Sequence, residues 1–117
     1  MRYEFILPDF TPRSANEYTF AKVGQRIRRK AGDRDLVAHY ARQSGIPRAT
    51  GKRRVSLVVT LAKGGRAVDP DNAWKGILDG LKQAETIVND SYLWVELGAY
   101  TINRGERRET LVVLEDL

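Results

Sequence analysis

Apolar and polar residues alternate along the middle of the chain, a period that is typical of a half-buried strand. The clearest run is 53–62, in which every second residue is apolar: Val55, Leu57, Val59 and Leu61. Shorter runs predict strands at 2–7, 92–102 and 107–115, and we expect the last two to form a hairpin across Asn103–Glu106. The pattern therefore predicts a small sheet that is largely antiparallel.

A helical period replaces this alternation between residues 70 and 84. The apolar residues there fall at i, i+3, i+4 and i+7, on one face of a helix: Trp74, Ile77, Leu78 and Leu81. Asp69 suits the N-cap and Pro70 the first helical position, so the helix has a favourable start.

A second helical pattern begins near Asn16, passes through Phe20, Val23 and Ile27, and is interrupted, or followed by a new helix, at Gly32-Asp33. The loop 44–51 separates it from the central strand. Together the segments predict an α+β fold, a small mixed, largely antiparallel sheet with helices packed on it.

Composition narrows the possible classes of protein. A length of 117 residues predicts a single domain over 1–117. The absence of cysteine excludes disulfides and thiolate zinc sites, and His39, the only histidine, excludes a multi-histidine metal site. The first residues do not resemble a signal peptide and no stretch is long and apolar enough to span a membrane, so we expect a cytoplasmic protein.

Charge is distributed unevenly along the sequence. Residues 1–66 hold 15 basic and 5 acidic residues, whereas residues 67–117 hold 5 basic and 10 acidic ones, within a net charge of +5. This asymmetry indicates a basic surface for an anionic polymer beside an acidic site. The alternative is a set of solvated charged faces.

Three aspartates surround the second predicted helix. Asp69 and Asp71 stand at its start, and Asp90 follows shortly after its end. We expect a turn and a returning strand to bring Asp90 back to the other two. Three carboxylates at one place require a cation, and oxygen ligands favour Mg²⁺, for which Mn²⁺ can substitute. A hard metal on a basic protein indicates phosphodiester chemistry on nucleic acid.

Lys75 falls one helical turn after Asp71, and Asp79 one turn after Lys75. An ammonium in that position can stabilise charge that develops on a phosphate. The alternative is structural: Asp69 caps the helix, Asp71 favours its dipole, and Asp71, Lys75 and Asp79 form a surface ladder of ion pairs.

The pattern Asp69-x-Asp71-Asn72-x-x-Lys75-x-x-x-Asp79-x-Leu81, followed by Asn89-Asp90, resembles the RusA family of Holliday-junction resolvases. These are small, dimeric, Mg²⁺-dependent endonucleases of recombination and repair, common in bacteria, prophages and phages. The resemblance is specific across residues 66–95. It implies a RusA-like fold, a bacterial cytoplasm and a homodimer that acts on four-way junctions or related branched DNA.

The resemblance also implies roles for individual residues. The family's catalytic and metal-binding acids fall on Asp69, Asp71 and Asp90, and its helix lysine falls on Lys75. Supportive positions fall on three further polar residues: Asn72, Asp79 and Asn89. The chain departs from the family at Asn89, where an aspartate is usual, so one charge is lost there. A branched-DNA-binding protein with weakened catalysis is therefore the alternative function.

The remaining expectations concern partners. We expect phosphate contacts from eight basic residues: Arg26, Arg28, Arg29, Lys30, Arg53, Arg54, Lys63 and Arg66. Tyr92 and Trp94 are expected to pack on the sheet, with a DNA contact of Tyr92 as the alternative. For the homodimer, the sequence leaves open an exposed strand edge or the amphipathic segment near Phe20, Val23 and Ile27.

Overall fold

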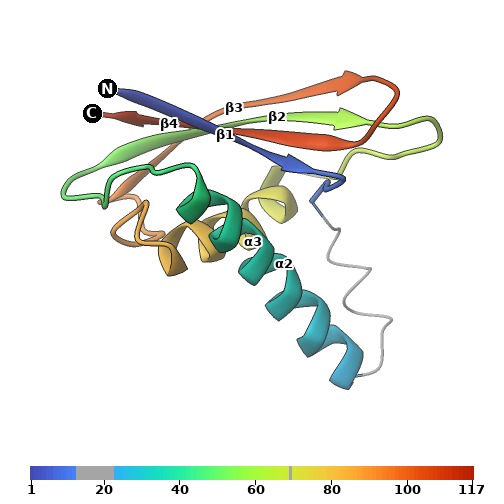
Figure 1. The fold of residues 1–117 in the computed structure, drawn as a ribbon, viewed down its shortest axis with the longest axis horizontal. Helices are drawn as coiled ribbons and strands as arrows, with labels where there is room; N and C mark the ends of the chain where they lie inside the picture. The colour runs from blue at the N-terminus through green and yellow to red at the C-terminus, as the bar shows by residue number, and fades with distance from the viewer. Residues whose placement is uncertain (13–22, 69) are drawn as a thin grey trace.

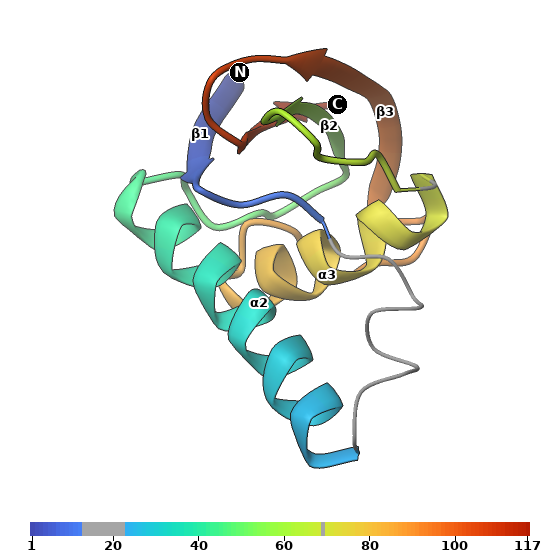
Figure 2. The same cartoon turned by 90° about the vertical axis from the view of Figure 1, so that its right-hand side faces the viewer.

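The computed structural model describes residues 1–12, 23–68 and 70–117, without the side chains of residues 23–30. The described elements are β1 (Arg2–Pro8), α2 (Val23–Gln43), β2 (Arg53–Leu61), α3 (Pro70–Gln83), β3 (Val95–Arg104) and β4 (Glu109–Asp116). The strands form one sheet in the order β1-β4-β2-β3, and both helices cover the same face of it (Figures 1 and 2). The predicted mixed α+β architecture is confirmed.

The predicted hairpin between residues 92–102 and 107–115 is wrong. β3 and β4 do not pair, because β2 lies between them, parallel to β3 and antiparallel to β4. β4 also pairs with β1 and buries Val112 and Leu114 completely, so it needs a partner on each side. The short loop between β3 and β4 suggested that these strands pair. The strand order is instead set by which strands must bury their apolar faces inside the sheet.

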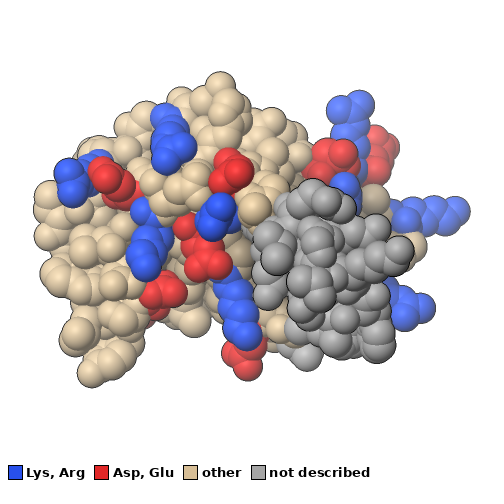
Figure 3. Space-filling model, turned by 90° about the horizontal axis from the view of Figure 1, so that it is seen from below, with Lys and Arg blue, Asp and Glu red and all other residues tan. Residues whose placement is uncertain are grey.

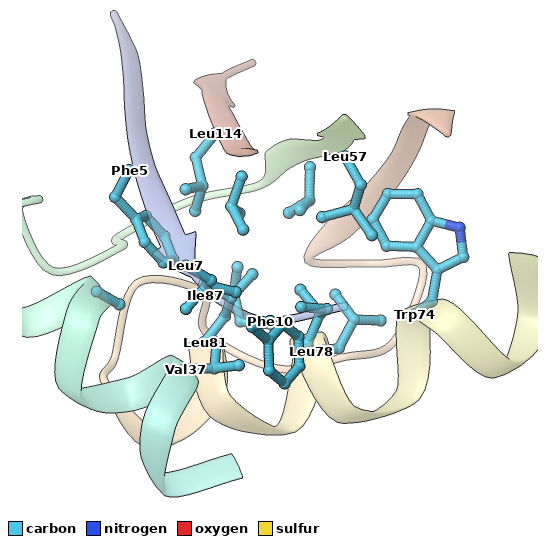
Figure 4. Close-up of a cluster of buried hydrophobic side chains, with 14 of the residues drawn as sticks. Phe5, Leu7, Phe10, Val37, Leu57, Trp74, Leu78, Leu81, Ile87 and Leu114 are labelled. Carbon is cyan, nitrogen blue, oxygen red and sulfur yellow. The ribbon is translucent and has the colours of Figure 1, made fainter. Parts of the chain in front are cut away.

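The hydrophobic core lies between the helices and the sheet (Figure 4). The central strand β2 alternates as predicted, with its inward side chains at most 2% exposed: Val55, Leu57, Val59 and Leu61. The apolar stripe of α3 is buried against them, and Trp74 is 5% exposed, which confirms its place in the core. This packing fixes the direction of α3 relative to β2 and β3.

α2 runs without a break through Gly32, so neither the interruption nor the new helix expected there is present. The first part of the predicted helical region, from Asn16 to residue 22, lies outside the described residues. The first turns of α2 project away from the sheet, whereas its second half packs on α3 (Figures 1 and 2). No helix among the described residues is long and apolar enough to cross a membrane.

The contact between α2 and α3 depends on Gly80. A Cβ placed on Gly80 would lie 2.4 Å from Val37 Cβ and 2.9 Å from the carbonyl oxygen of Arg34, both on α2. These separations are shorter than van der Waals contact, so the two helices approach more closely than any larger residue allows. Gly76, one turn earlier, has no such neighbour within 4 Å.

We therefore expect Gly80→Ala and Gly76→Ala to change stability in opposite directions. Gly80→Ala forces the helices apart and should lower the free energy of unfolding by roughly 1–3 kcal/mol. Gly76→Ala adds helix propensity without a clash and should raise it by up to about 1 kcal/mol. Urea denaturation followed by circular dichroism measures both, and equal effects of the two substitutions would contradict the close helix contact.

Candidate active site

The first two turns of α3 present Asp71 and Lys75 to solvent. Both side chains are exposed, and Asp79 follows on the same face. The ladder of ion pairs, which was the structural alternative, is absent: none of the three makes an ion pair with any residue that the structure describes. The carboxylate of Asp71 and the ammonium of Lys75 are therefore available to a cation and to an anion, respectively.

The chain that leads into α3 is attached to the sheet. Tyr100 on β3 donates a hydrogen bond from its hydroxyl to the carbonyl oxygen of Val68, at 3.1 Å. Because α3 runs back against the direction of β2 and β3, its first turn lies toward the carboxyl ends of both strands (Figure 1). Asp69 lies outside the described residues, although its neighbour Val68 is held in this way.

Asp90 lies in the loop after the last turn of α3, whereas Asp71 lies in the first turn (Figure 1). The exposed Asp90 lines a hollow together with Leu78, Lys52 and residues of β3, and Asp71 does not line that hollow. Asn89 Oδ1 accepts a hydrogen bond of 2.7 Å from the Asp90 backbone N–H. The predicted convergence of Asp90 with Asp69 and Asp71 stays a prediction, since Asp69 lies outside the described residues.

No group of three or more acidic or histidine side chains suited to a metal occurs among the described residues, a set that leaves out Asp69. Mg²⁺ is commonly held by one or two carboxylates together with water and substrate phosphate oxygens. Asp69 and Asp71, two residues apart at the start of one helix, supply donors of that kind. The three-acid metal site predicted from the sequence stays a prediction.

Arg53, expected to contact DNA, belongs instead to the interior. It is 3% exposed, and its guanidinium donates hydrogen bonds to Asp116 at 2.8 Å and to the carbonyl oxygens of Pro47 and Thr86, each at 2.9 Å. It also stacks over Tyr3, 5.0 Å from the ring centroid. The hydrogen bond from Arg53 holds the pKa of the Asp116 carboxyl below its ordinary value. The charge count of the sequence could not show that Arg53 links β2 to the C-terminal strand and to the loops that contain Pro47 and Thr86.

Arg54 is partly exposed and is paired with Glu96 on β3. This hydrogen bond raises the pKa of Arg54. Its charge is therefore partly neutralised within the sheet.

The four basic residues expected to bind phosphate near the start of α2 lie on its projecting first turns, and their side chains are outside the described part: Arg26, Arg28, Arg29 and Lys30.

Four basic residues gather at the carboxyl ends of β2 and β3, and we call them the cationic tip: Lys63, Arg66, Arg104 and Arg107. Two hydrogen bonds join the loops that carry them, from Gly105 N to Leu61 O at 3.0 Å and from Arg104 Nη1 to Gly65 O at 2.9 Å. Figure 3 shows basic side chains projecting from this end of the molecule.

Members of the cationic tip make no ion pair with any described residue, whereas their neighbour Arg108 is paired with Asp9 at 2.9 Å. The first turn of α3, which carries Asp71, lies toward the same end of the sheet (Figure 1). Sequence analysis assigned phosphate contacts to Lys63 and Arg66 but not to Arg104 and Arg107. The run Arg104 to Arg108 was visible in the sequence, but only the parallel pairing of β2 and β3 places it beside Lys63 and Arg66.

The chain matches no protein-family model, and a search of curated proteins finds no relative. What is established is the class that the fold defines: a small mixed α+β protein in which exposed acidic and basic side chains near one end of the sheet make no ion pair with the residues that the structure describes.

We expect Arg53→Met to unfold the protein more readily and Arg54→Met to change its stability little. The first substitution removes the donor from the carbonyl oxygens of Pro47 and Thr86, the second of which is buried, and should lower the free energy of unfolding by roughly 2–4 kcal/mol. The second removes only a solvent-exposed pair. Chemical denaturation of both variants tests this assignment, which fails if Arg53→Met is as stable as Arg54→Met.

Proposed function

We propose that this protein is a Mg²⁺-dependent, structure-selective endodeoxyribonuclease that acts as a homodimer and resolves Holliday junctions or related branched DNA in recombination and repair. The observation that carries the proposal is the exposed start of α3, where Asp71 and Lys75 make no ion pair with any described residue and which lies toward the same end of the sheet as the cationic tip. The resemblance of residues 66–95 to the RusA family supports the same reaction and substrate.

In the proposed mechanism Asp69 and Asp71 hold the metal at the start of α3, where the buried stripe of the helix and the Tyr100–Val68 hydrogen bond keep the backbone in place. Bound Mg²⁺ supplies an activated water and offsets negative charge on the phosphate. Lys75 lies one turn along the helix and donates hydrogen bonds to the non-bridging oxygens of the scissile phosphate. Because Lys75 has no acidic partner in the described structure, its full charge acts on that phosphate.

Asp90 enters the proposal as the third acid, on the strength of the sequence pattern and of the resemblance. Its carboxylate is exposed, in the loop that follows α3. An Asp90→Asn variant separates two possibilities: loss of cleavage assigns Asp90 to the reaction, and retention of cleavage limits the site to Asp69 and Asp71.

DNA binding is assigned to the cationic tip together with the projecting first turns of α2. Phosphate contacts of this kind position the nucleic acid without reading its sequence, which suits an enzyme that recognises branched shape. Arg53 has no part in this surface because it is buried, and Arg54 contributes little because it is paired with Glu96.

The second candidate function is binding of branched DNA without cleavage. It is favoured by Asn89, which carries no charge where the family usually has an aspartate and whose side-chain oxygen is engaged by the backbone of Asp90. A Mg²⁺-dependent cleavage assay on a synthetic four-way junction decides between the two: symmetric nicks support the nuclease, and binding without nicks supports the second candidate.

We expect Asp71→Asn to abolish cleavage while junction affinity is kept or rises, because the substitution removes a metal ligand and a charge that repels phosphate. The rate should fall by at least about 100-fold, since losing groups that merely support metal ligands already costs 10–100-fold. Lys75→Ala should slow cleavage by roughly 100-fold and still bind. Single-turnover cleavage and gel-shift titration measure the two effects.

Asp35→Asn is the matched control for Asp71→Asn. It removes one exposed carboxylate on α2, far along the chain from the candidate site, and keeps an oxygen that can accept the hydrogen bond from Gln83. Cleavage by Asp71→Asn at the wild-type rate would show that the assigned site is wrong.

The cationic tip leads to a separate expectation about salt. The double variant Arg104→Gln/Arg107→Gln should weaken binding of any branched DNA and reduce the slope of log affinity against log salt by about 1.8, because each phosphate contact contributes about 0.9. The matched double variant Arg42→Gln/Lys82→Gln removes two charges near the last turns of α2 and α3 and should leave the slope unchanged. Equal slopes for the two double variants would remove the tip from the DNA surface.

A further inference from the structure

The turn before β3 presents three large apolar side chains in succession to solvent: Tyr92, Leu93 and Trp94 are 80%, 62% and 37% exposed. The expectation that Tyr92 packs on the sheet is therefore wrong. Hydrogen bonds nevertheless hold the backbone of the turn, because the N–H group of Trp94 donates to the carbonyl oxygen of Ser91 at 3.0 Å, and the carbonyl oxygen of Trp94 accepts from the N–H group of Arg53 at 3.1 Å. Contiguous apolar exposure of this kind marks a binding surface.

The ring of Tyr92 lines a hollow of about 440 Å³ between α3 and the first residues of β3. Two further lining residues, Leu78 and Val95, belong to the hydrophobic core and are 9% and 4% exposed, so the hollow reaches the core. Tyr92 and Leu97 are the exposed apolar members of the lining. Ligand sites in proteins span about 300–1,000 Å³, so this hollow suits a small, flat and largely apolar group.

Two groups of opposite charge in the lining of the hollow have no ionic partner. They are Lys52 and Asp90, neither of which makes an ion pair with a residue that the structure describes. Glu96 also lines the hollow, but its carboxylate is paired with Arg54. One ammonium and one carboxylate balance in charge. The hollow therefore favours a neutral occupant that offers a hydrogen-bond acceptor to Lys52 and a donor to Asp90.

A nucleobase combines these properties. Its faces stack on aromatic side chains, and its edge carries acceptors and, in most bases, an amino donor. A hydrocarbon side chain from a protein partner would also fill the apolar part of the hollow. It would, however, remove water from Lys52 and Asp90 without replacing their hydrogen bonds, which is costly. The exposed aromatic ring, the apolar lining and the two complementary polar groups together favour a base over an apolar side chain.

We propose that this hollow binds one unpaired nucleobase of the DNA substrate, stacked on the ring of Tyr92. The proposal rests on the proposed function for its substrate and adds a means of recognising branched DNA. A base inside a duplex is enclosed by its neighbours and its pairing partner, so only a base that has left the stack reaches the hollow. Leaving the stack costs least where the base is already unpaired. Phosphate contacts are equally available in plain duplex, so Tyr92 supplies the preference for distorted DNA.

Gel-shift titration of the full chain without Mg²⁺ tests the proposal on two probes, a DNA duplex with one unpaired base and the same duplex fully paired. Tyr92→Ala should weaken binding of the first probe by about 5- to 150-fold, the stacking contribution of one base expressed as a ratio of affinities. Binding of the paired duplex should not change. Tyr92→Phe should restore the preference because it keeps the ring. Leu93→Ala is the matched control, since Leu93 is exposed in the same turn but does not line the hollow.

Three results would overturn the proposal. The first is equal affinity of the wild-type protein for the two probes. The second is a Tyr92→Ala variant that keeps the wild-type preference or loses no more of it than Leu93→Ala does. The third is a change in the sedimentation of the protein without DNA on Tyr92→Ala, which would show that the ring is covered by protein and not by a base.

Photochemical cross-linking provides a second measurement, which uses the wild-type chain and therefore does not depend on any substitution. The unpaired base of the first probe is replaced by 5-iodouracil, which couples on irradiation to an aromatic side chain in contact with it. Mass spectrometry of the digested complex should identify Tyr92 as the coupled residue. The same base placed inside the paired duplex is the control and should not couple there. Coupling of the unpaired base only at residues outside the hollow would contradict the proposal.

Neither measurement reads DNA cleavage, so the base site and the proposed nuclease activity can fail separately. A protein that prefers the unpaired base through Tyr92 but cuts no junction keeps the base site and supports the second candidate function. A protein that cuts junctions and is indifferent to Tyr92→Ala keeps the nuclease and removes the base site. A protein that binds neither probe and no junction overturns both.

Discussion

The packing of α3 on the inner face of β2 determines where the candidate groups of this protein lie. Trp74 and Leu81 anchor the two ends of the apolar stripe of α3, and each faces a strand whose inward residues are fully buried. A helix that returns antiparallel between two parallel strands must begin at their carboxyl ends. The polar face of the helix is then left in water, so Asp71 and Lys75 are exposed because their neighbours are buried.

The same constraint separates the arginines by role. Charged groups that lie over the sheet or between its loops have found partners: Arg53 with Asp116 and two carbonyl oxygens, and Arg54 with Glu96. Burial requires such pairing, since an unpaired charge in the interior is costly. At the ends of β2 and β3 the chain leaves the core, and the cationic tip has no acidic partner among the described residues. The basic side chains that can act on a ligand therefore lie in the loops outside the hydrophobic core.

The edge strand β3 has an unusual position in this arrangement. It belongs to the β2-α3-β3 unit and supplies Tyr100 to the start of α3, yet most of its residues are exposed. A bulge at Gly98 and Ala99 shifts its pairing with β2, and Gly98 lies so close to Ser56 that no side chain fits. The strand is thus firmly attached to β2 on one side and exposed on the other.

Local pattern determined much of this protein. The alternation along β2, the stripe of α3 and the Asp-Pro helix start predicted those elements within a residue or two, because the period of apolar residues is imposed by the backbone geometry itself. The exposure of Asp71 and Lys75 followed from the helical period of α3. Pattern also gave the mixed α+β class, since strands and helices with one apolar side can be buried only against one another.

Only the tertiary structure decided the relations between distant segments. Three relations depend on which surfaces meet: the strand order that separates β3 from β4, the burial of Arg53, and the joining of the loop after β3 to the loop after β2. Residue type and spacing do not give these relations. A charge count cannot distinguish a buried, paired arginine from an exposed one, and the pattern of a strand does not indicate which strand it pairs with. Sequence alone determined the elements and their faces, and packing in three dimensions decided which charges were neutralised and which remained available for function.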